Sequence, residues 1–198
     1  KNTKSSIYNY YTLFDKEYFN KKKYYDLKNY SVIEIGKNRY NIGINNCIFR
    51  TNKILENVIH HYMTKHYKSS WGLLTSECQS NNGPWHRDVV NICGESDELG
   101  HYDDSAMVHN FNPFYFNMHI PLVPLNKENG TTEFIIGSHK MTYNEAKNKP
   151  RKQFETEFGD VIMFDGRIFH RGRENKSSAS RPVLYNMIHR DWYVESGL

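Results

Sequence analysis

The second half of the chain is a series of short apolar segments, each bounded by turn residues. From residue 114 to 123 the sequence FYFNMHIPLV alternates, so Phe116 and Met118 share one face of an extended strand and Asn117 and His119 share the other. An Asn-Gly pair at residues 129–130 is a strong turn signal, and the apolar segment TTEFII follows it. The segment RPVLYNMIHRDWY closes the series. Short strands in this arrangement predict a jelly roll or double-stranded β-helix.

Two further local signals lie within this series. The segment GDVIMFDGRIFHRG has apolar stretches on both sides of Asp165-Gly166, which predicts a β-hairpin with a type I′ turn. Gly137 closes the strand TTEFII, and Thr142 and Glu145 have the spacing of a capping box. We therefore expect a short helix there, which must end before Pro150.

The first third of the chain has a different pattern. Residues 1–30 are polar and aromatic and predict a peripheral arm with one short helix, and residues 31–50 predict short strands with Gly36 and Gly43 at turns. Residues 52–67 predict a helix, capped by Thr51 or Asn52, whose apolar stripe is Ile54, Leu55, Val58, Ile59, Tyr62 and Tyr67.

These patterns together predict a single domain over residues 1–198 that is mainly β with peripheral helices (α+β). Residues 1–70 would form an N-terminal arm and helical support, and residues 71–198 the cupin-like double-stranded β-helix or jelly-roll core.

Composition excludes several classes of protein. No apolar run approaches the roughly 20 residues that span a bilayer, and no secretory signal pattern occurs, so we expect no membrane contact. Three scattered cysteines argue against a disulfide framework and against a cysteine zinc site, and we therefore expect an intracellular setting. The net charge of +4 favours an anionic substrate. The enriched residue types all have AT-rich codons, which accounts for the lysines without a nucleic-acid surface.

Three His-x-Asp triplets occur, at residues 86–88, 101–103 and 189–191. The triplet at 189–191 has too little chain after it to supply a third metal ligand. The triplet at 101–103 lies in the polar stretch GESDELGHYDDSA, which has no strand pattern. The first triplet is bounded by Pro84-Trp85 and an apolar Val-Val pair, and it has a candidate partner far downstream.

That partner is His170. Two imidazoles and one carboxylate, here His86, His170 and Asp88, form the ligand set of non-heme Fe(II) oxygenases, with open positions opposite for a chelating co-substrate and O₂. Arg181 follows eleven residues later, on the next predicted strand. A guanidinium binds a carboxylate through two parallel hydrogen bonds, as the far end of 2-oxoglutarate requires. The set predicts Fe(II), 2-oxoglutarate and O₂ as cofactor and co-substrates.

Four other residues are weaker candidates for co-substrate contacts. Asn117 and His119 lie on the polar strand face and are either contacts of 2-oxoglutarate or packed polar residues. Thr132 follows the Asn-Gly turn and would line the mouth of the barrel. Tyr185 shares a strand face with Arg181 and is either a co-substrate contact or part of the core.

The chain resembles the phytanoyl-CoA dioxygenase-like family of Fe(II)/2-oxoglutarate-dependent dioxygenases over about residues 72–193. The resemblance lies in the segments PWHRD, IPLVPLNKENGTTEFIIGSHK, GDVIMFDGRIFHRGREN and RPVLYNMIHRDWY. It implies metal ligands at His86, Asp88 and His170, and a 2-oxoglutarate arginine at Arg181. It also implies hydroxylation of an unactivated C–H bond of a small molecule or a side chain, with release of succinate and CO₂. Ile136 stands where the family has proline.

Two rival interpretations remain open at this stage. One is a cupin-like metal protein without 2-oxoglutarate chemistry, and the other is a non-catalytic jelly-roll binding module. The substrate is also open, because the loops over the barrel mouth select it. The polar stretch GESDELGHYDDSAMVHN is expected to be a lid.

Overall fold

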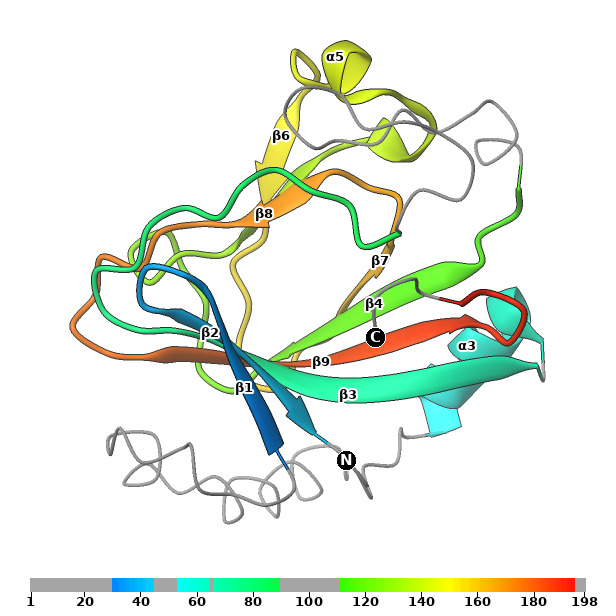
Figure 1. Ribbon diagram of the computed structural model, residues 1–198, viewed down its shortest axis with the longest axis horizontal. Helices are drawn as coiled ribbons and strands as arrows, with labels where there is room; N and C mark the ends of the chain where they lie inside the picture. Colours follow the sequence, from blue (N-terminus) through cyan, green and yellow to red (C-terminus); the bar gives the residue numbers. More distant parts are fainter. Residues whose placement is uncertain (1–29, 45–52, 65, 90–110, 195–198) are drawn as a thin grey trace.

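The computed structural model describes residues 30–44, 53–64, 66–89 and 111–194 (Figure 1). Three expectations from the sequence lie outside these residues: the N-terminal arm with its short helix, the helix cap at residues 51–52, and the lid at residues 94–110. Within the described residues, no helix has both the length and the apolar character needed to cross a bilayer.

Two antiparallel β-sheets contain most of the regular secondary structure of the described chain, as expected for a mainly β protein (Figure 1). The larger sheet contains, in spatial order, β1 (Tyr30–Gly36), β2 (Arg39–Ile44), β3 (Tyr67–Ser76), β9 (Arg181–Arg190), β4 (Tyr115–Pro121) and β7 (Ile162–Asp165). The smaller sheet contains β6 (Arg151–Gln153), β5 (Thr132–Ile135) and β8 (His170–Gly172).

Strand β4 shows why one face of the larger sheet packs against a helix and the other carries polar side chains. Its apolar residues Phe116 and Met118 are buried against Ile59 of helix α3 (Lys53–Met63). Asn117 and His119 alternate with them, so they point to the opposite face. The predicted alternation is therefore correct, and the polar side chains lie on the face away from the helix.

Helix α3 is shorter than the predicted span of 52–67. Thr64 adopts a left-handed backbone conformation, with φ 59°, and this ends the helix one residue after Met63. Tyr67 then begins β3 instead of completing the helical stripe. The stripe itself was partly wrong: Ile59 and Met63 are the buried residues, whereas Ile54, Val58 and Tyr62 are exposed.

The first hairpin turns at residues 37–38, directly after Gly36, so a turn lies where Gly36 predicted one. Asn38 has a φ of 56°, a conformation that asparagine tolerates better than most residues. Gly43 was predicted at a turn, but it lies within β2, where it pairs with Ser31 on one side and Gly72 on the other.

The predicted hairpin around Asp165-Gly166 is also wrong. β7 pairs with β4 and β8 pairs with β5, so the chain crosses from the larger sheet to the smaller one. The Asp165 carboxylate accepts hydrogen bonds from the backbone N and the Nε of Arg167, both at 2.9 Å, and thereby shapes the turn. Gly166 does not have positive φ, as a type I′ turn requires. It is needed because a Cβ there would lie 2.4 Å from the ring of Tyr115.

The remaining local predictions are correct. Gly130 and Gly137 both have positive φ, at 79° and 78°, and lie before and after β5. Thr142 and Glu145 form the complete capping box of α5 (Tyr143–Ala146), which follows the short 3₁₀ helix η2 (Ser138–Lys140). The final apolar segment forms β9.

Candidate metal centre and co-substrate pocket

The two candidate histidine ligands are paired through their backbones. The N–H of His86 donates to the carbonyl of His170, and the N–H of His170 donates to the carbonyl of His86, both at 3.0 Å. The segment that contains His86 therefore extends the smaller sheet beyond β8. Residues directly opposite in an antiparallel bridge share a face, and the two imidazole centroids lie 4.3 Å apart.

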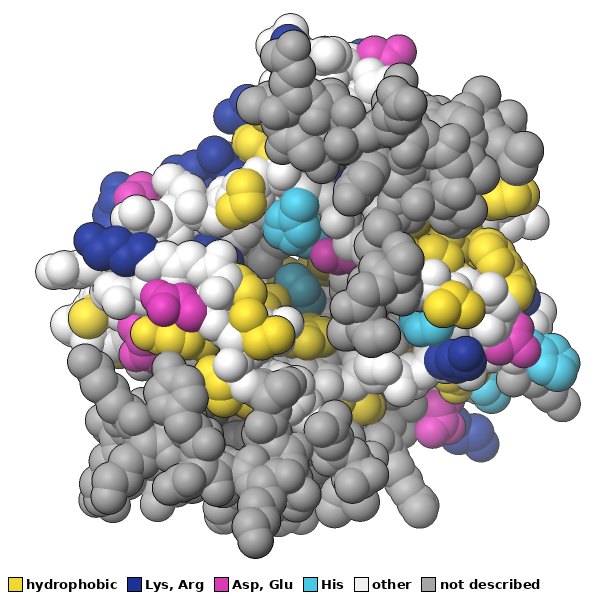
Figure 2. Space-filling view, viewed as in Figure 1, with side chains coloured by type: hydrophobic (Ala, Val, Ile, Leu, Met, Phe, Trp, Pro, Cys, Tyr) yellow, Lys and Arg dark blue, Asp and Glu magenta, His cyan; other side chains and the backbone are white. Residues whose placement is uncertain are grey.

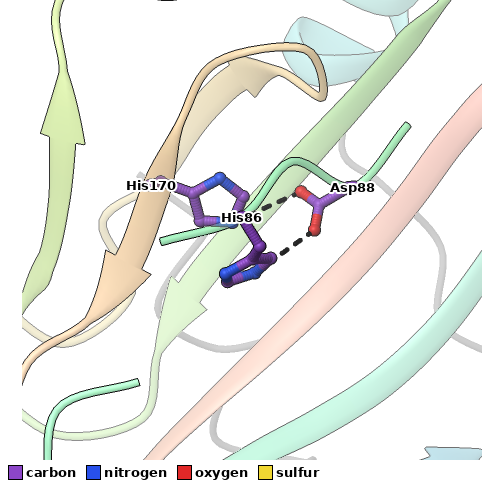
Figure 3. Close-up of side chains that lie close together, drawn as sticks. All are labelled: His86, Asp88 and His170. Atoms are coloured by element: carbon purple, nitrogen blue, oxygen red, sulfur yellow. Dashed lines mark ion pairs between the residues drawn. The ribbon is translucent and has the colours of Figure 1, made fainter. Parts of the chain in front are cut away.

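Asp88 completes the cluster. Its Oδ1 lies 3.7 Å from Nε2 of His86 and its Oδ2 lies 3.4 Å from Nε2 of His170 (Figure 3). Within the described residues, this is the one group of three or more histidine, cysteine or acidic side chains close enough to hold a metal. All three ligand atoms lie within 4.8 Å of one another.

Both imidazoles present Nε2 to the centre of this cluster. Nδ1 of His86 lies 3.0 Å from the carbonyl of Pro84, and Nδ1 of His170 lies 3.0 Å from the carbonyl of Ile168. A carbonyl only accepts, so each Nδ1 must be the protonated nitrogen, and each Nε2 has its lone pair free for a metal.

The electrostatics also favour a neutral imidazole at His170. Burial lowers the pKa of His170, against the opposing effect of Asp88. Two neutral imidazole nitrogens and one carboxylate oxygen, open to a cavity on one side, are the donor set that Fe(II) takes in non-heme oxygenases. The residues present therefore fit a ferrous ion.

The cluster opens into a cavity of ≈ 210 Å³ between the two sheets. Figure 2 shows a hollow in this face of the molecule, with histidine and acidic side chains at it. All the site residues predicted from the sequence line this cavity: His86, Asp88, Asn117, His119, Thr132, His170, Arg181 and Tyr185.

The weaker candidates contact either the metal cluster or one another. Asn117 Nδ2 donates to Oδ2 of Asp88. Thr132 Oγ1 lies 3.4 Å from Nδ1 of His119. Burial, followed by the charge of His170, lowers the pKa of His119 to about 3, so its imidazole is neutral at neutral pH.

Tyr185 is fixed at the far wall of the cavity. Its hydroxyl donates to Oδ1 of Asn41 at 2.9 Å. Its ring lies over Gly72, where a Cβ would be 2.2 Å from the hydroxyl oxygen.

Arg181 is a buried cation at the same cavity. Its side chain is only 4% exposed, and Nη2 donates to Oγ of Ser76 at 2.7 Å. Nε has no hydrogen-bond partner within the described residues. Burial, with a smaller contribution from the charge of Arg39, lowers the pKa of Arg181 to about 9. Within the part of the chain that the structure describes, no carboxylate compensates the charge of this guanidinium.

Sequence reasoning missed two residues of this wall, Arg39 and Ser76. Arg39 lines the cavity, and Ser76 holds the guanidinium of Arg181. They are brought beside Arg181 by strand register, because Arg39 pairs with Ser76 and Ser76 pairs with Arg181. No local pattern in the sequence predicts that alignment of the three strands.

Two residues that precede His86 have separate contacts. The ring of Trp85 packs against Arg171 and Arg151, whose guanidinium carbons lie 4.5 and 5.3 Å from its centroid. The carbonyl of Pro84 holds the imidazole of His86.

The rival His-x-Asp triplets do not form a described site. His189 stacks on Tyr115, and Asp191 lies 4.0 Å from His66, with no third ligand near either among the described residues. The triplet at residues 101–103 lies outside the described residues.

Comparison with known proteins shows which protein family this chain is similar to. The model described as Phytanoyl-CoA dioxygenase (PhyH) matches residues 52–183. The Fe(II)/2-oxoglutarate-dependent dioxygenase nvfF of Aspergillus novofumigatus is 30% identical over 103 residues, which are 46% of this chain and 35% of that protein. The chain spans about a third of the length of the curated relatives that it matches.

Solved structures share the fold at low sequence identity. AviO1 of Streptomyces viridochromogenes has a TM-score of 0.62 at 17% identity, covering 98% of this chain and 85% of that one. HygX of Streptomyces hygroscopicus, solved with nickel, 2-oxoglutarate and hygromycin B bound, has a TM-score of 0.56 at 10% identity. That match covers 84% of this chain and 76% of HygX. The expected cupin-like double-stranded β-helix core is thereby confirmed.

Proposed function

Because the chain belongs to the phytanoyl-CoA dioxygenase (PhyH) family, we propose that it is an Fe(II)- and 2-oxoglutarate-dependent dioxygenase. One observation supports this most directly. A His-Asp-His cluster lines the same cavity as a buried arginine, which has no carboxylate partner among the described residues. That is the arrangement a chelating diacid needs, with one end at the metal and the other at a guanidinium.

In this proposal His86, Asp88 and His170 hold the ferrous ion. When bound, iron supplies activation of O₂, which couples oxidative decarboxylation of 2-oxoglutarate to oxidation of an unactivated C–H bond and releases succinate and CO₂. Hydrogen bonds from Nδ1 to the carbonyl oxygens of Pro84 and Ile168 keep both imidazoles in the tautomer that binds metal.

The other cavity residues position the co-substrate. Arg181 binds the distal carboxylate of 2-oxoglutarate, and burial makes that ion pair stronger than an exposed one. Asn117 holds the carboxylate of Asp88, and neutral His119 with Thr132 closes the wall between the metal and Arg181.

The substrate approaches from the side of His86, whose side chain is 46% exposed, whereas that of His170 is 5% exposed. We propose a small molecule as substrate, in line with the hygromycin B bound to HygX. The net charge of +4 favours an anionic one.

Two measurements test the proposal. Anaerobic addition of Fe(II) and 2-oxoglutarate should produce a weak visible charge-transfer band, and exposure to air should yield succinate even without substrate. His170→Ala should abolish both signals. His61→Ala, which removes an exposed histidine of α3, should change neither.

The rival functions give different results. A cupin-like protein without a 2-oxo acid site gives no band, and a non-catalytic binding module gives no succinate. Retention of full succinate production in His170→Ala would reject the ligand assignment.

A further inference from the structure

We propose that Arg39 is a second cationic anchor for the distal carboxylate of 2-oxoglutarate, acting beside Arg181. This inference rests on the proposed function. It adds a specificity-determining residue from β2, a strand that none of the other proposed ligands occupies.

The first observation is the register of three neighbouring strands. Arg39 of β2 pairs with Ser76 of β3, and Ser76 pairs with Arg181 of β9. Directly opposed residues point to the same face of a sheet, so the three side chains form one row across the larger sheet. The middle member already binds one end of the row, because Ser76 Oγ accepts from Nη2 of Arg181 at 2.7 Å.

The second observation is that this row holds two buried positive charges. Arg39 is 9% exposed and Arg181 is 4% exposed. In the described part of the chain, no carboxylate lies within ion-pair distance of either guanidinium. Two buried positive charges in one row repel each other, and each also loses its hydration. An anion bound between them would offset both the repulsion and the desolvation.

The third observation is how the guanidinium of Arg39 is held. Nη1 donates to the carbonyl of Gly172 at 3.0 Å and lies 3.4 Å from the carbonyl of Asn81. Among the described residues, Nη2 and Nε of Arg39 have no acceptor, which leaves donors for a ligand in the cavity that Arg39 lines. Gly172 permits this position, because a Cβ there would lie 2.0 Å from Nη2.

These contacts place Arg39 at the distal end of the proposed co-substrate site. Gly172 is two residues beyond His170 on β8, and it pairs with Thr132 across the smaller sheet. A carboxylate has two oxygens and about four acceptor positions, enough for donors from two guanidinium groups and the Ser76 hydroxyl. A 2-oxo acid without that carboxylate would leave both cations uncompensated, so the row selects for a diacid.

The test is calorimetric titration of the nickel-loaded protein, which binds ligand without turnover. The ligands are 2-oxoglutarate and 2-oxopentanoate, which has a methyl group in place of the distal carboxylate. Arg39→Gln should weaken 2-oxoglutarate binding by about 10- to 100-fold, since it leaves a charged hydrogen-bonding group unpaired. Binding of 2-oxopentanoate should change less than about 2-fold, because it makes no contact there.

Matched variants separate the anchor from general effects. Lys68→Gln removes the same charge from an exposed position of β3 and should leave both affinities unchanged. Gly172→Ala keeps the charge but displaces the guanidinium, and it should weaken 2-oxoglutarate binding. Gly83→Ala adds a Cβ at an ordinary 3.6 Å from Cζ of Arg39 and serves as its control. If displacement is the cause, Gly172→Ala should add nothing to Arg39→Gln.

The outcomes are distinct. An Arg39→Gln protein with wild-type thermal stability and wild-type affinity for 2-oxoglutarate overturns the inference and leaves the proposed function intact. If Arg39→Gln does not fold, Gly172→Ala decides by the same affinity criterion. Failure of the wild-type protein to bind 2-oxoglutarate would remove the inference and the proposed function together.

Discussion

Asn117 Nδ2 donates a hydrogen bond to Oδ2 of Asp88, the same carboxylate oxygen that lies 3.4 Å from Nε2 of His170. The amide is 4% exposed, and its Oδ1 has no partner in the described residues. One side chain of β4 thus fixes the orientation of a carboxylate from a separate segment. Interactions of this kind orient metal ligands and raise metal affinity.

We therefore predict that Asn117→Leu lowers the affinity for Fe(II) or Ni(II) by about 10- to 100-fold, the usual effect of losing such a partner. Isothermal titration of the metal measures this. Asn186→Leu is the control, because Asn186 is also a buried amide but bonds Ser69 Oγ on the same sheet. Equal losses in the two variants would mean that both act through stability and not through Asp88.

The pKa of His119 predicts how stability depends on pH. The unfolded chain protonates this histidine below about pH 6.5, whereas burial keeps it neutral in the folded chain down to about 3. The unfolded state therefore binds more protons between these values, and folding stability must fall as the pH drops through this range. His170 contributes in the same direction, since burial lowers its pKa as well.

We expect His119→Asn to reduce this acid sensitivity. Between pH 7.5 and 4.5 the metal-free wild type should lose about 2 kcal/mol more of its unfolding free energy than the variant. Urea unfolding in the presence of a chelator measures both values. His61→Asn, at an exposed position of α3, should behave as wild type, and parallel pH profiles for all three proteins would contradict the prediction.

The backbone conformation of two glycines gives a paired test of the turns around β5. Gly130 and Gly137 have nearly equal φ values, 79° and 78°. A Cβ at Gly130 would lie 2.3 Å from the carbonyl oxygen of Glu174, whereas one at Gly137 would meet no described atom within 4 Å. Gly137→Ala should cost about 1 kcal/mol for the left-handed conformation alone.

Gly130→Ala should cost about 1–3 kcal/mol more, because a backbone atom cannot move aside as a side chain can. Thermal unfolding or denaturant titration of the two single variants gives the difference. Similar losses at both positions would show that the chain near Glu174 adjusts freely.

Features encoded by adjacent residues were predictable from the sequence. The alternation of β4, the capping box of Thr142 and Glu145, and the glycine turns around β5 all depend on residues within a few positions of one another. The residues that set His86 and Asp88 apart from the other triplets, Pro84-Trp85 and an apolar Val-Val pair, are also local, and the candidate partner His170 lies in the predicted strand segment GDVIMFDGRIFHRG.

Features set by pairing between distant strands were not predictable. Apolar stretches beside Asp165-Gly166 are compatible with a hairpin, but β7 and β8 find partners in different sheets. Arg39 reaches the carbonyl of Gly172, which is 133 residues away, only because β2, β3 and β9 align in one register. Register is chosen by tertiary packing, which a single sequence does not display.

The turn at Gly166 connects stability to the metal centre. Its carbonyl accepts hydrogen bonds from the backbone N–H of Asp88 at 2.9 Å and of Val89 at 3.4 Å, so it helps to hold the metal-binding segment. A Cβ at this position would lie 2.4 Å from the ring of Tyr115, which is 1% exposed and cannot easily move.

We predict that Gly166→Ala destabilises the fold by about 1–3 kcal/mol and also weakens metal binding, because relief of the clash must shift the carbonyl that Asp88 uses. Gly36→Ala is the matched control, since among the described residues its Cβ would meet only the side chain of Arg39, at 3.7 Å. Denaturant unfolding and metal titration on both variants check the two effects, and a Gly166→Ala protein that loses stability but keeps full metal affinity would show that the turn does not position Asp88.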